Sequence, residues 1–178
     1  VQFFEWDKHS ENHNYELVKS WFESKKNIGL MSEAGLPCIA DPGNDIVTLA
    51  HKYDYDVVPL AGPSSIILAL IASGMNGQNF AFNGYLPIDK AERVKKIKQL
   101  ESRALSEKQT QIFMETPYRN LGLVEDVIKN CSQQIFFSIA SNIGESNAYI
   151  KTKSIQDWKK IPLPDIHKKP TIFSLGLS

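Results

Sequence analysis

Apolar residues recur along the first part of the chain in two alternating patterns, one typical of helices and one typical of strands. Positions 15, 18, 21 and 22 have helical spacing, and the short apolar run 27–31 follows them. The alternation continues with a helix around 46–50, a strand at 56–60 and a nearly all-apolar helix at 66–72, which we expect to be buried. Because strands that alternate with helices require a mainly parallel sheet, an α/β fold is predicted.

The alternation starts again after Gly77. We expect strands at 80–85, 111–114 and 135–140, helices at 90–102 and 117–130, and two later strands at 148–152 and 171–177, separated by a short helix around Trp158. This restart predicts two α/β lobes, with residues 1–77 in the first and residues 78–178 in the second. A cleft between two lobes is a common ligand site.

Two loops rich in small residues join predicted strand ends to the helices that follow. The first covers residues 32–43 and the second covers residues 59–65. Ligands bind at such strand ends in open α/β sheets, and glycine allows the backbone to approach them closely. Asp41 and Ser64 are placed to cap the following helices. Taken singly, each loop is equally typical of an ordinary tight connection.

Taken together and in this order, the two loops resemble the tetrapyrrole methylase superfamily, and most closely its branch that methylates a ribose 2′-hydroxyl of small-subunit ribosomal RNA. Residues 32–43 are similar to the family's Ser-Asp-Ala-Gly-Thr-Pro-x-Ile-Ser-Asp-Pro-Gly, and residues 59–65 to its Pro-Gly-Pro-Ser-Ala turn. Further along, residues 82–87 resemble Gly-Phe-Leu-Pro and residues 115–119 resemble Glu-Ser-Pro-His-Arg. Residues 9–14 are weakly similar to a His-Asn-Glu segment. The resemblance covers nearly the whole chain.

The chain also departs from the pattern of this family. The family's initial Pro-Ile-Gly-Asn-Leu strand has no counterpart, so we expect a fragment whose first lobe is truncated at its N-terminus. Glu33 stands for Asp, Leu36 for Thr and Tyr118 for His, and residues 140–142 read Ala-Ser-Asn where the family has Ala-Arg-Glu. We therefore expect the cofactor site to be better preserved than the substrate site.

The resemblance implies that S-adenosylmethionine binds between the two lobes. The residues that it places around this cofactor are Ser32, Glu33, Ala34, Gly35, Ser64, Ser65, Met114, Glu115, Thr116, Ala140, Ser141 and Asn142. Each of them is also an ordinary strand-end residue, and for Met114 and Ala140 packing in the core is an equal alternative. Methyl transfer from a sulfonium chiefly requires the two reactants to be positioned. The sequence accordingly shows no convincing catalytic triad.

Glu115 and Arg119 are the candidate catalytic residues, and the sequence identifies no general base. Glu115 ends an apolar strand, so its carboxylate is expected to be partly buried and to need a partner. Arg119 lies one helical turn further on, at a helix start where an arginine gains nothing from the helix dipole. This position suits contact with a phosphate or a carboxylate. The alternative is a surface arginine paired with a nearby carboxylate.

Charge is balanced over the whole chain but unevenly distributed. The sequence has 20 Lys and Arg and 20 Asp and Glu. Up to Gly77, five lysines face ten acidic residues, whereas fifteen basic residues face ten acidic ones beyond it. The basic residues gather at 90–108 and 151–169, which is a mild pointer to a polyanionic partner. Acidic residues interleaved in the first stretch equally suit a solvated helix face.

Three functions stay open at this stage. The first is an S-adenosylmethionine-dependent methyltransferase that acts on a ribose of small-subunit ribosomal RNA. The second is a methyltransferase of the same superfamily that acts on a tetrapyrrole or another small molecule, and the third is a non-catalytic remnant that binds a ligand or a partner. With the first function we expect ribosomal RNA or the small ribosomal subunit as partner, a homodimer and a cytoplasmic location.

Several classes of site are disfavoured by the sequence. No apolar run approaches the length of a membrane span, so no membrane contact is expected. The four histidines form no ligand cluster, and His9 with His13 is more typical of a solvated pair than of a metal site. Cys38 and Cys131 suit buried free thiols better than a disulfide.

Overall fold

A computed structural model describes residues 2–6 and 15–177 of the 178-residue chain. Its contacts divide the chain into two compact units, Val1–Ser64 and Ser65–Ser178. This division assigns the helix that begins at Ser65 to the second unit. The lobe boundary near residue 77 that the sequence suggests stays a prediction.

The first unit contains two amphipathic helices, α1 (Tyr15–Glu23) and α2 (Asn44–Lys52). Both were predicted from helical spacing, and both are confirmed. Their buried apolar residues form one small cluster, which consists of Val18, Phe22, Ile46 and Ala50. The ring of Tyr55 packs 4.8 Å from that of Phe22, measured between centroids, and its hydroxyl donates a hydrogen bond to the Phe22 carbonyl.

The prediction of two strands in the first unit is wrong. Residues 27–31 and 56–60 have no strand assignment in the structure. A strand exists only where a neighbouring chain segment exchanges backbone hydrogen bonds with it, and among the described residues neither segment has such a partner. Several of their apolar side chains are exposed, by 75% for Met31, 73% for Val58 and 82% for Leu60, whereas Ile28 and Leu30 pack partly buried on the first-unit cluster.

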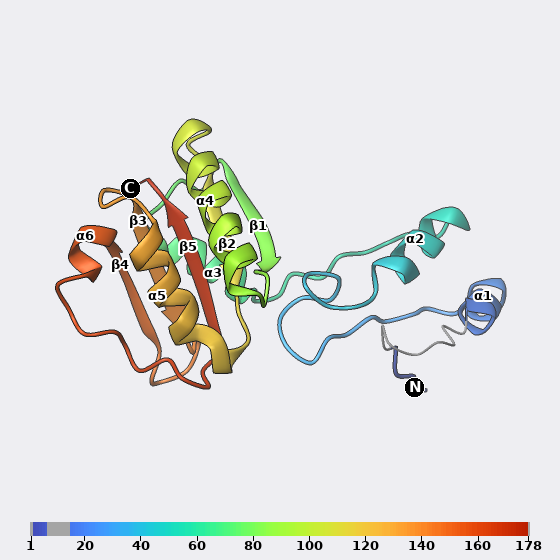
Figure 1. The fold of residues 1–178 in the computed structure, drawn as a ribbon. Helices are drawn as coiled ribbons and strands as arrows, with labels where there is room; N and C mark the ends of the chain where they lie inside the picture. Colours follow the sequence, from blue (N-terminus) through green and yellow to red (C-terminus); the bar gives the residue numbers. More distant parts are fainter. Residues whose placement is uncertain (1, 7–14, 178) are drawn as a thin grey trace. The chain divides into compact units, whose positions relative to one another are not determined.

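The second unit is built on a five-stranded sheet with the order β1-β2-β5-β3-β4 (Figure 1). The strands are β1 (Phe80–Tyr85), β2 (Thr110–Met114), β3 (Phe136–Ser141), β4 (Tyr149–Ser154) and β5 (Thr171–Gly176). All five were predicted from the sequence. The mainly parallel sheet predicted from the pattern before Gly77 is not formed there, because the described residues of that part contain no strand. In the second unit, only the pairing of β1 with β2 is parallel. The last strand, β5, lies between β2 and β3 and runs antiparallel to both.

Helices cover both faces of this sheet (Figure 1). α4 (Lys90–Ser106) and α5 (Asn120–Asn130) lie on one face, and α3 (Ser65–Ser73) lies on the other. The short helix α6 (Ile155–Trp158) follows β4. The predicted helix over 117–130 is divided into a 3₁₀ turn, η1 (Pro117–Arg119), and α5. Asp89 caps α4 by accepting a hydrogen bond from the Glu92 amide at 3.0 Å.

Each face of the sheet has its own apolar cluster. The larger cluster packs α4, α5 and α6 on the sheet and includes Phe113, Phe137, Phe173 and Trp158. The smaller cluster packs Ile66, Ala69 and Leu70 of α3 on the opposite face. The expectation that this helix is buried holds for one side only, since Ile67, Leu68 and Ile71 are 42%, 40% and 71% exposed. Packing on a sheet buries only one side of a helix.

Candidate functional site

The first-unit part of the candidate site is the loop at 32–43. The Ser32 hydroxyl donates to the carbonyls of Ala34 and Gly35, at 3.4 and 3.2 Å. Four loop residues have left-handed backbone conformations, with φ of 75° at Gly35, 67° at Cys38, 62° at Ala40 and 124° at Gly43. Left-handed residues other than glycine are uncommon and store strain, and such strain clusters at ligand sites.

Glycine is required at the end of this loop. Gly43 is the N-cap residue of α2 and makes no side-chain cap, so the prediction that Asp41 caps this helix is wrong. A Cβ atom on Gly43 would lie 2.4 Å from Leu30 Cδ2. The second loop also comes close to the first, because a Cβ atom on Gly62 would lie 3.1 Å from Leu36 Cδ2. The two predicted loops therefore meet within the first unit.

The second-unit part of the candidate site lies where β2 and β3 end. Because both strands run antiparallel to β5, their carboxyl ends lie at the same edge of the sheet. Met114 of β2 and Ala140 of β3 both pair with Ile172, from its two sides, and Ser141 pairs with Thr171. The structure thus brings together the predicted segments 114–116 and 140–142. Met114 and Ala140 also pack in the cluster under α3, as the alternative for these two residues predicts.

Glu115 and Arg119 form an ion pair at this sheet edge. Glu115 is 3% exposed, and its Oε1 accepts hydrogen bonds from Arg119 Nη2 and from the Thr116 amide, each at 2.7 Å. The partner that the sequence suggested for this carboxylate is therefore confirmed. The catalytic role of the two residues stays a prediction.

Three buried polar atoms gather beside this ion pair. Glu115 Oε2, Arg119 Nε and Asn120 Oδ1 have no hydrogen-bond partner within the described part of the chain. Buried polar atoms are nearly always hydrogen-bonded, because an unpaired one costs roughly 1 to 3 kcal/mol. Within the described residues, two acceptors and one donor at this sheet edge are therefore left without a partner.

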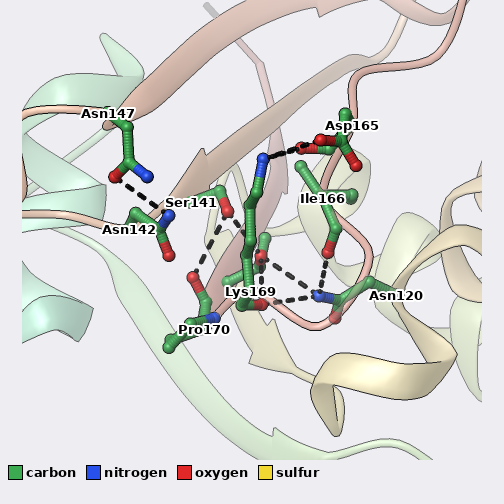
Figure 2. A network of polar contacts seen from close by, with 9 residues as sticks. Asn120, Ser141, Asn142, Asn147, Asp165, Ile166, Lys169 and Pro170 are labelled. Carbon is green, nitrogen blue, oxygen red and sulfur yellow. Dashed lines mark hydrogen bonds and ion pairs between the residues drawn. The ribbon is translucent and has the colours of Figure 1, made fainter.

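Asn120 holds the neighbouring loop in place (Figure 2). Its Nδ2 group donates to the carbonyls of Ile166 and Lys169, at 3.0 and 2.8 Å, and lies 3.2 Å from Thr171 Oγ1. The Thr171 hydroxyl in turn donates to Ser141 Oγ at 3.0 Å. Asn120 is fully buried. This network connects the start of α5, the loop before β5 and the end of β3.

Sequence reasoning missed Asn120 and Thr171. Their partners are 30 to 51 residues away along the chain, so neither local spacing nor a motif indicates them. The loop after β3 is fixed in a similar way: Asn142 Nδ2 donates to Asn147 Oδ1 at 3.1 Å, and the Asn142 amide donates to the Pro170 carbonyl at 2.9 Å (Figure 2).

Neither cysteine is an activated nucleophile. Both are free thiols. Burial and the nearby Glu101 carboxylate raise the pKa of the Cys131 thiol to about 12. Burial and Asp45 likewise raise the pKa of Cys38. Since only the thiolate is reactive, covalent chemistry through these residues is disfavoured.

Two further expectations concern metal and membrane. His9 and His13 lie outside the described residues. In the part of the chain that the structure does describe, no group of three His, Cys, Asp or Glu side chains is placed to hold a metal ion. No helix among residues 15–177 is long and apolar enough to cross a membrane.

Comparison with curated proteins confirms the resemblance inferred from the motifs. The chain is 41% identical over 119 residues to ribosomal RNA small subunit methyltransferase I of Bacillus subtilis, which covers 67% of this chain and 38% of the relative. It is 32% identical over 157 residues to the protein of the same name from Buchnera aphidicola (subsp. Schizaphis graminum), with 86% and 54% covered. The chain thus spans about half the length, or less, of these relatives. No family model matches it.

Comparison with solved structures confirms the fold. Diphthine synthase has a TM-score of 0.66 at 16% identity, covering 97% of this chain and 68% of that one. The methyltransferase CobJ has a TM-score of 0.59 at 14% identity, covering 100% and 78%. Together with the curated relatives, these neighbours bear out a methylase-type α/β fold. At such identities they carry no argument about the methyl acceptor.

Proposed function

We propose that this chain binds S-adenosylmethionine and provides the cofactor-binding part of a methyltransferase that modifies a ribose 2′-hydroxyl of small-subunit ribosomal RNA. The observation that carries the proposal is the convergence of segments 114–116 and 140–142 on one sheet edge, next to three unpaired buried polar atoms. The names of the curated relatives support ribosomal RNA as the acceptor.

The residues at the sheet edge fit the adenosine part of this cofactor. Adenosine offers hydroxyl and amino donors together with ring-nitrogen acceptors. Glu115 Oε2 and Asn120 Oδ1 are acceptors without a donor among the described residues, and Arg119 Nε is a donor without an acceptor. Met114, which precedes Glu115 and is only partly buried, adds apolar surface for a purine ring. The loop with Ser32 and Gly35 in the first unit, and the turn at Ser64 and Ser65 where the second unit begins, supply backbone groups.

The chain's own residues chiefly position the reactants. The bound cofactor supplies a methyl group on a sulfonium. Glu115 Oε1 holds Arg119 by a charge-assisted hydrogen bond, which fixes the guanidinium of a side chain that is 35% exposed. A fixed, partly exposed guanidinium is suited to hold a phosphate next to the reacting ribose. Such positioning contributes up to roughly 7 to 11 kcal/mol to catalysis in well-oriented systems.

The remaining expectations belong to the same proposal. If ribosomal RNA is the acceptor, the protein works in the cytoplasm and meets the small ribosomal subunit. We also propose two lobes with a boundary near residue 77, and a homodimer. Light scattering tests the last point, and a monomer mass over a wide concentration range would contradict the dimer.

Calorimetry with S-adenosylhomocysteine tests cofactor binding. We expect saturable binding by the 178-residue chain and a weaker response in Arg119→Ala. Lys159→Ala, which removes an exposed basic residue beyond α6, is the matched control and should bind like the unchanged chain. No heat and no thermal shift with any variant would contradict cofactor binding.

Transfer of a labelled methyl group tests the acceptor. Small ribosomal subunits from a strain that lacks the corresponding methylation should accept label, and subunits that already carry it should not. Transfer to a porphyrinoid with none to the ribosomal subunit would favour the small-molecule alternative instead. Cofactor binding with no transfer to either acceptor would favour the non-catalytic alternative.

A further inference from the structure

Beyond the residues used above, the carboxyl edge of the sheet presents an aromatic and basic cluster. Tyr118 follows β2 and is 71% exposed. The ammonium group of Lys168 lies 5.6 Å from the centroid of its ring, and the His167 ring meets it edge to face at 6.3 Å with an interplanar angle of 81°. Tyr118, His167 and Lys168 come from two segments about 50 residues apart in sequence. We call these three residues the Tyr118 platform.

The platform is held by a rigid frame. The Lys168 amide donates to the Pro117 carbonyl at 3.1 Å, which connects the two segments directly. The buried Asn120 side chain fixes the same loop through the carbonyls of Ile166 and Lys169. Lys168 itself has a left-handed backbone with φ of 60°. A lysine in that conformation carries a local energy cost, and the frame keeps it there with its side chain over the tyrosine ring.

The two lysines at the platform differ in their contacts with the carboxylates of residues 2–6 and 15–177. The Lys169 ammonium donates to the Asp165 carboxylate at 3.0 Å and to the Asp165 carbonyl at 2.7 Å. These contacts also lower the pKa of Asp165. Among the described residues Lys168 has no carboxylate within ion-pair distance, and its only recorded side-chain contact is the tyrosine ring. The platform therefore combines an accessible π-surface with a positive charge that no carboxylate of the described residues neutralises.

We propose that the Tyr118 platform stacks an unpaired nucleobase of RNA while Lys168 contacts the adjoining phosphate. This inference rests on the proposed function, because it takes the acceptor to be RNA. Proteins recognise single-stranded RNA by stacking splayed bases on aromatic side chains next to a basic groove. A lone exposed tyrosine is common on protein surfaces. A tyrosine that lies under a lysine and beside a histidine, on a loop fixed by a buried asparagine, is preorganised for such a ligand.

The position of the platform suits the proposed reaction. Tyr118 is the direct neighbour of Arg119, whose guanidinium is fixed by Glu115. A nucleotide with its base on Tyr118 therefore has its ribose and phosphate close to the residues proposed to hold the reacting group. The platform thus supplies recognition of the substrate, whereas Glu115 and Arg119 supply its orientation.

The test measures binding of a fluorescein-labelled single-stranded RNA of mixed sequence by anisotropy, with the 178-residue chain. Stacking contributes roughly 1 to 3 kcal/mol per base, so Tyr118→Ala should weaken binding by about 5-fold to about 150-fold. Tyr118→Phe keeps the ring and should stay within about twofold of the unchanged chain. Phe80→Ala, which removes a 40% exposed aromatic ring where β1 begins, at the opposite sheet edge, is the matched control and should not change affinity.

A second measurement reports on stacking and on the phosphate contact separately. A 2-aminopurine base in the RNA should be quenched by the unchanged chain and by Tyr118→Phe, but not by Tyr118→Ala. Lys168→Gln should reduce the slope of log affinity against log salt by about 0.7, the value for one phosphate of a single strand. Lys108→Gln is its control, because Lys108 is an exposed lysine with a φ of 50° just before β2 begins, at the opposite edge.

The outcomes separate this inference from the proposed function. RNA binding by the unchanged chain with equal affinity in Tyr118→Ala would overturn the platform, as would an equal loss in Phe80→Ala or an absence of RNA binding altogether. Binding that depends on Tyr118, without methyl transfer to ribosomal subunits, would leave the platform standing and overturn the proposed activity. Since Tyr118 is exposed, the urea midpoint of Tyr118→Ala should match that of the unchanged chain. If it does not, Tyr118→Phe and the quenching experiment decide.

Discussion

The two units of the chain place their candidate site residues by different physical means. In the second unit, segments 114–116 and 140–142 are located by strand register and by the buried side chains of Glu115 and Asn120. In the first unit, the loop at 32–43 is located by left-handed turns and by close glycine packing. The candidate site residues are therefore held by long-range bonding in one unit and by local backbone geometry in the other.

This difference determines where a mutation acts. A ladder and a buried polar network couple residues far apart in sequence, so the loss of one member is felt throughout the second unit. A strained loop acts mainly on its own conformation and on whatever it binds. Substitutions in the two units should accordingly differ in size and in the distance over which they act.

The largest effect is expected for Asn120→Ala. This substitution removes Asn120 Nδ2, which donates to the carbonyls of Ile166 and Lys169 and to Thr171 Oγ1. Asn120 is fully buried, so water cannot replace these bonds. Leaving such groups unpaired should lower the free energy of unfolding by roughly 2 to 4 kcal/mol. Urea unfolding followed by Trp158 fluorescence, with Trp6 and Trp21 replaced by Phe, would measure it in the second unit.

Asn130→Ala is the matched control for this prediction. Asn130 lies on the same helix but makes a single bond, from its Nδ2 group to the Asp126 carbonyl at 2.8 Å. Its replacement should cost about 1 kcal/mol or less. Equal losses in the two variants would show that the Asn120 network has no special part in holding the unit together.

An intermediate effect, dependent on pH, is expected for Glu101→Gln. Burial raises the pKa of the Glu101 carboxyl, but the Ser132 amide at 2.5 Å and Lys98 at 3.2 Å outweigh it, so the pKa is lowered overall. A pKa lower in the folded than in the unfolded state stabilises the fold above the unfolded value of about 4.3, and this contribution is lost as the pH falls through the folded value.

Glu101→Gln should therefore lower the free energy of unfolding at neutral pH by about 1 to 2 kcal/mol. As the pH falls, the free energy of unfolding of this variant should decrease less steeply than that of the unchanged chain. Glu92→Gln on the same helix is the control, because the Glu92 carboxylate is 63% exposed and lies 4.0 Å from Lys95. Urea unfolding at a series of pH values measures both variants. An acid-induced loss that is as steep in Glu101→Gln as in the unchanged chain would contradict this account.

An effect of similar size but with the shortest reach along the chain is expected for Gly35→Ala in the first unit. No atom lies within 4 Å of the added Cβ, but the φ of 75° is left-handed. The strain should cost roughly 1 to 2 kcal/mol, seen as faster amide exchange confined to the first unit. Affinity for S-adenosylhomocysteine should fall, and Gly35→Val, whose larger side chain enters the space next to the backbone, should abolish it.

Gly29→Ala controls for the loss of a glycine alone. Gly29 lies in the same unit, also has open space around an added Cβ, and has no left-handed φ. It should leave exchange and affinity unchanged. Faster exchange in the second unit of Gly35→Ala would contradict the comparison, because it would mean that the loop is coupled beyond its own unit.

The periodicity of apolar residues predicts helices and strands well where one side of the element is buried and where a neighbouring strand is present to pair with each strand. The strands and helices of the second unit were predictable because alternation and helical spacing are preserved when a sheet is covered on both faces. The same signal at 27–31 and 56–60 predicted strands that the structure does not form, since an apolar run says nothing about whether a neighbour is there to pair with it. Whether neighbouring strands run parallel or antiparallel could not be predicted either. The reason is that β5, which lies between β2 and β3, comes from a distant part of the chain.

The residues of the candidate site were likewise predictable only where their partners lie close by in the sequence. Glu115 and Arg119 could be paired from the sequence because they are one helical turn apart. Asn120, Thr171 and Lys168 could not be identified, because their roles depend on contacts made across the fold. The left-handed Cys38 and Ala40 were equally hidden, since neither residue type indicates such a conformation.

The central place of β5 also sets the order in which the second unit can be completed during synthesis. The β1–β2 pair and the β3–β4 pair are made first and have no hydrogen bonds to each other, and only β5 joins them. Until residues 171–176 have left the ribosome, each pair presents an open edge where β5 will insert. Contacts formed over such long sequence separations fold slowly and leave unpaired edges exposed meanwhile. Chaperone dependence of the nascent chain should therefore end with the arrival of this one strand.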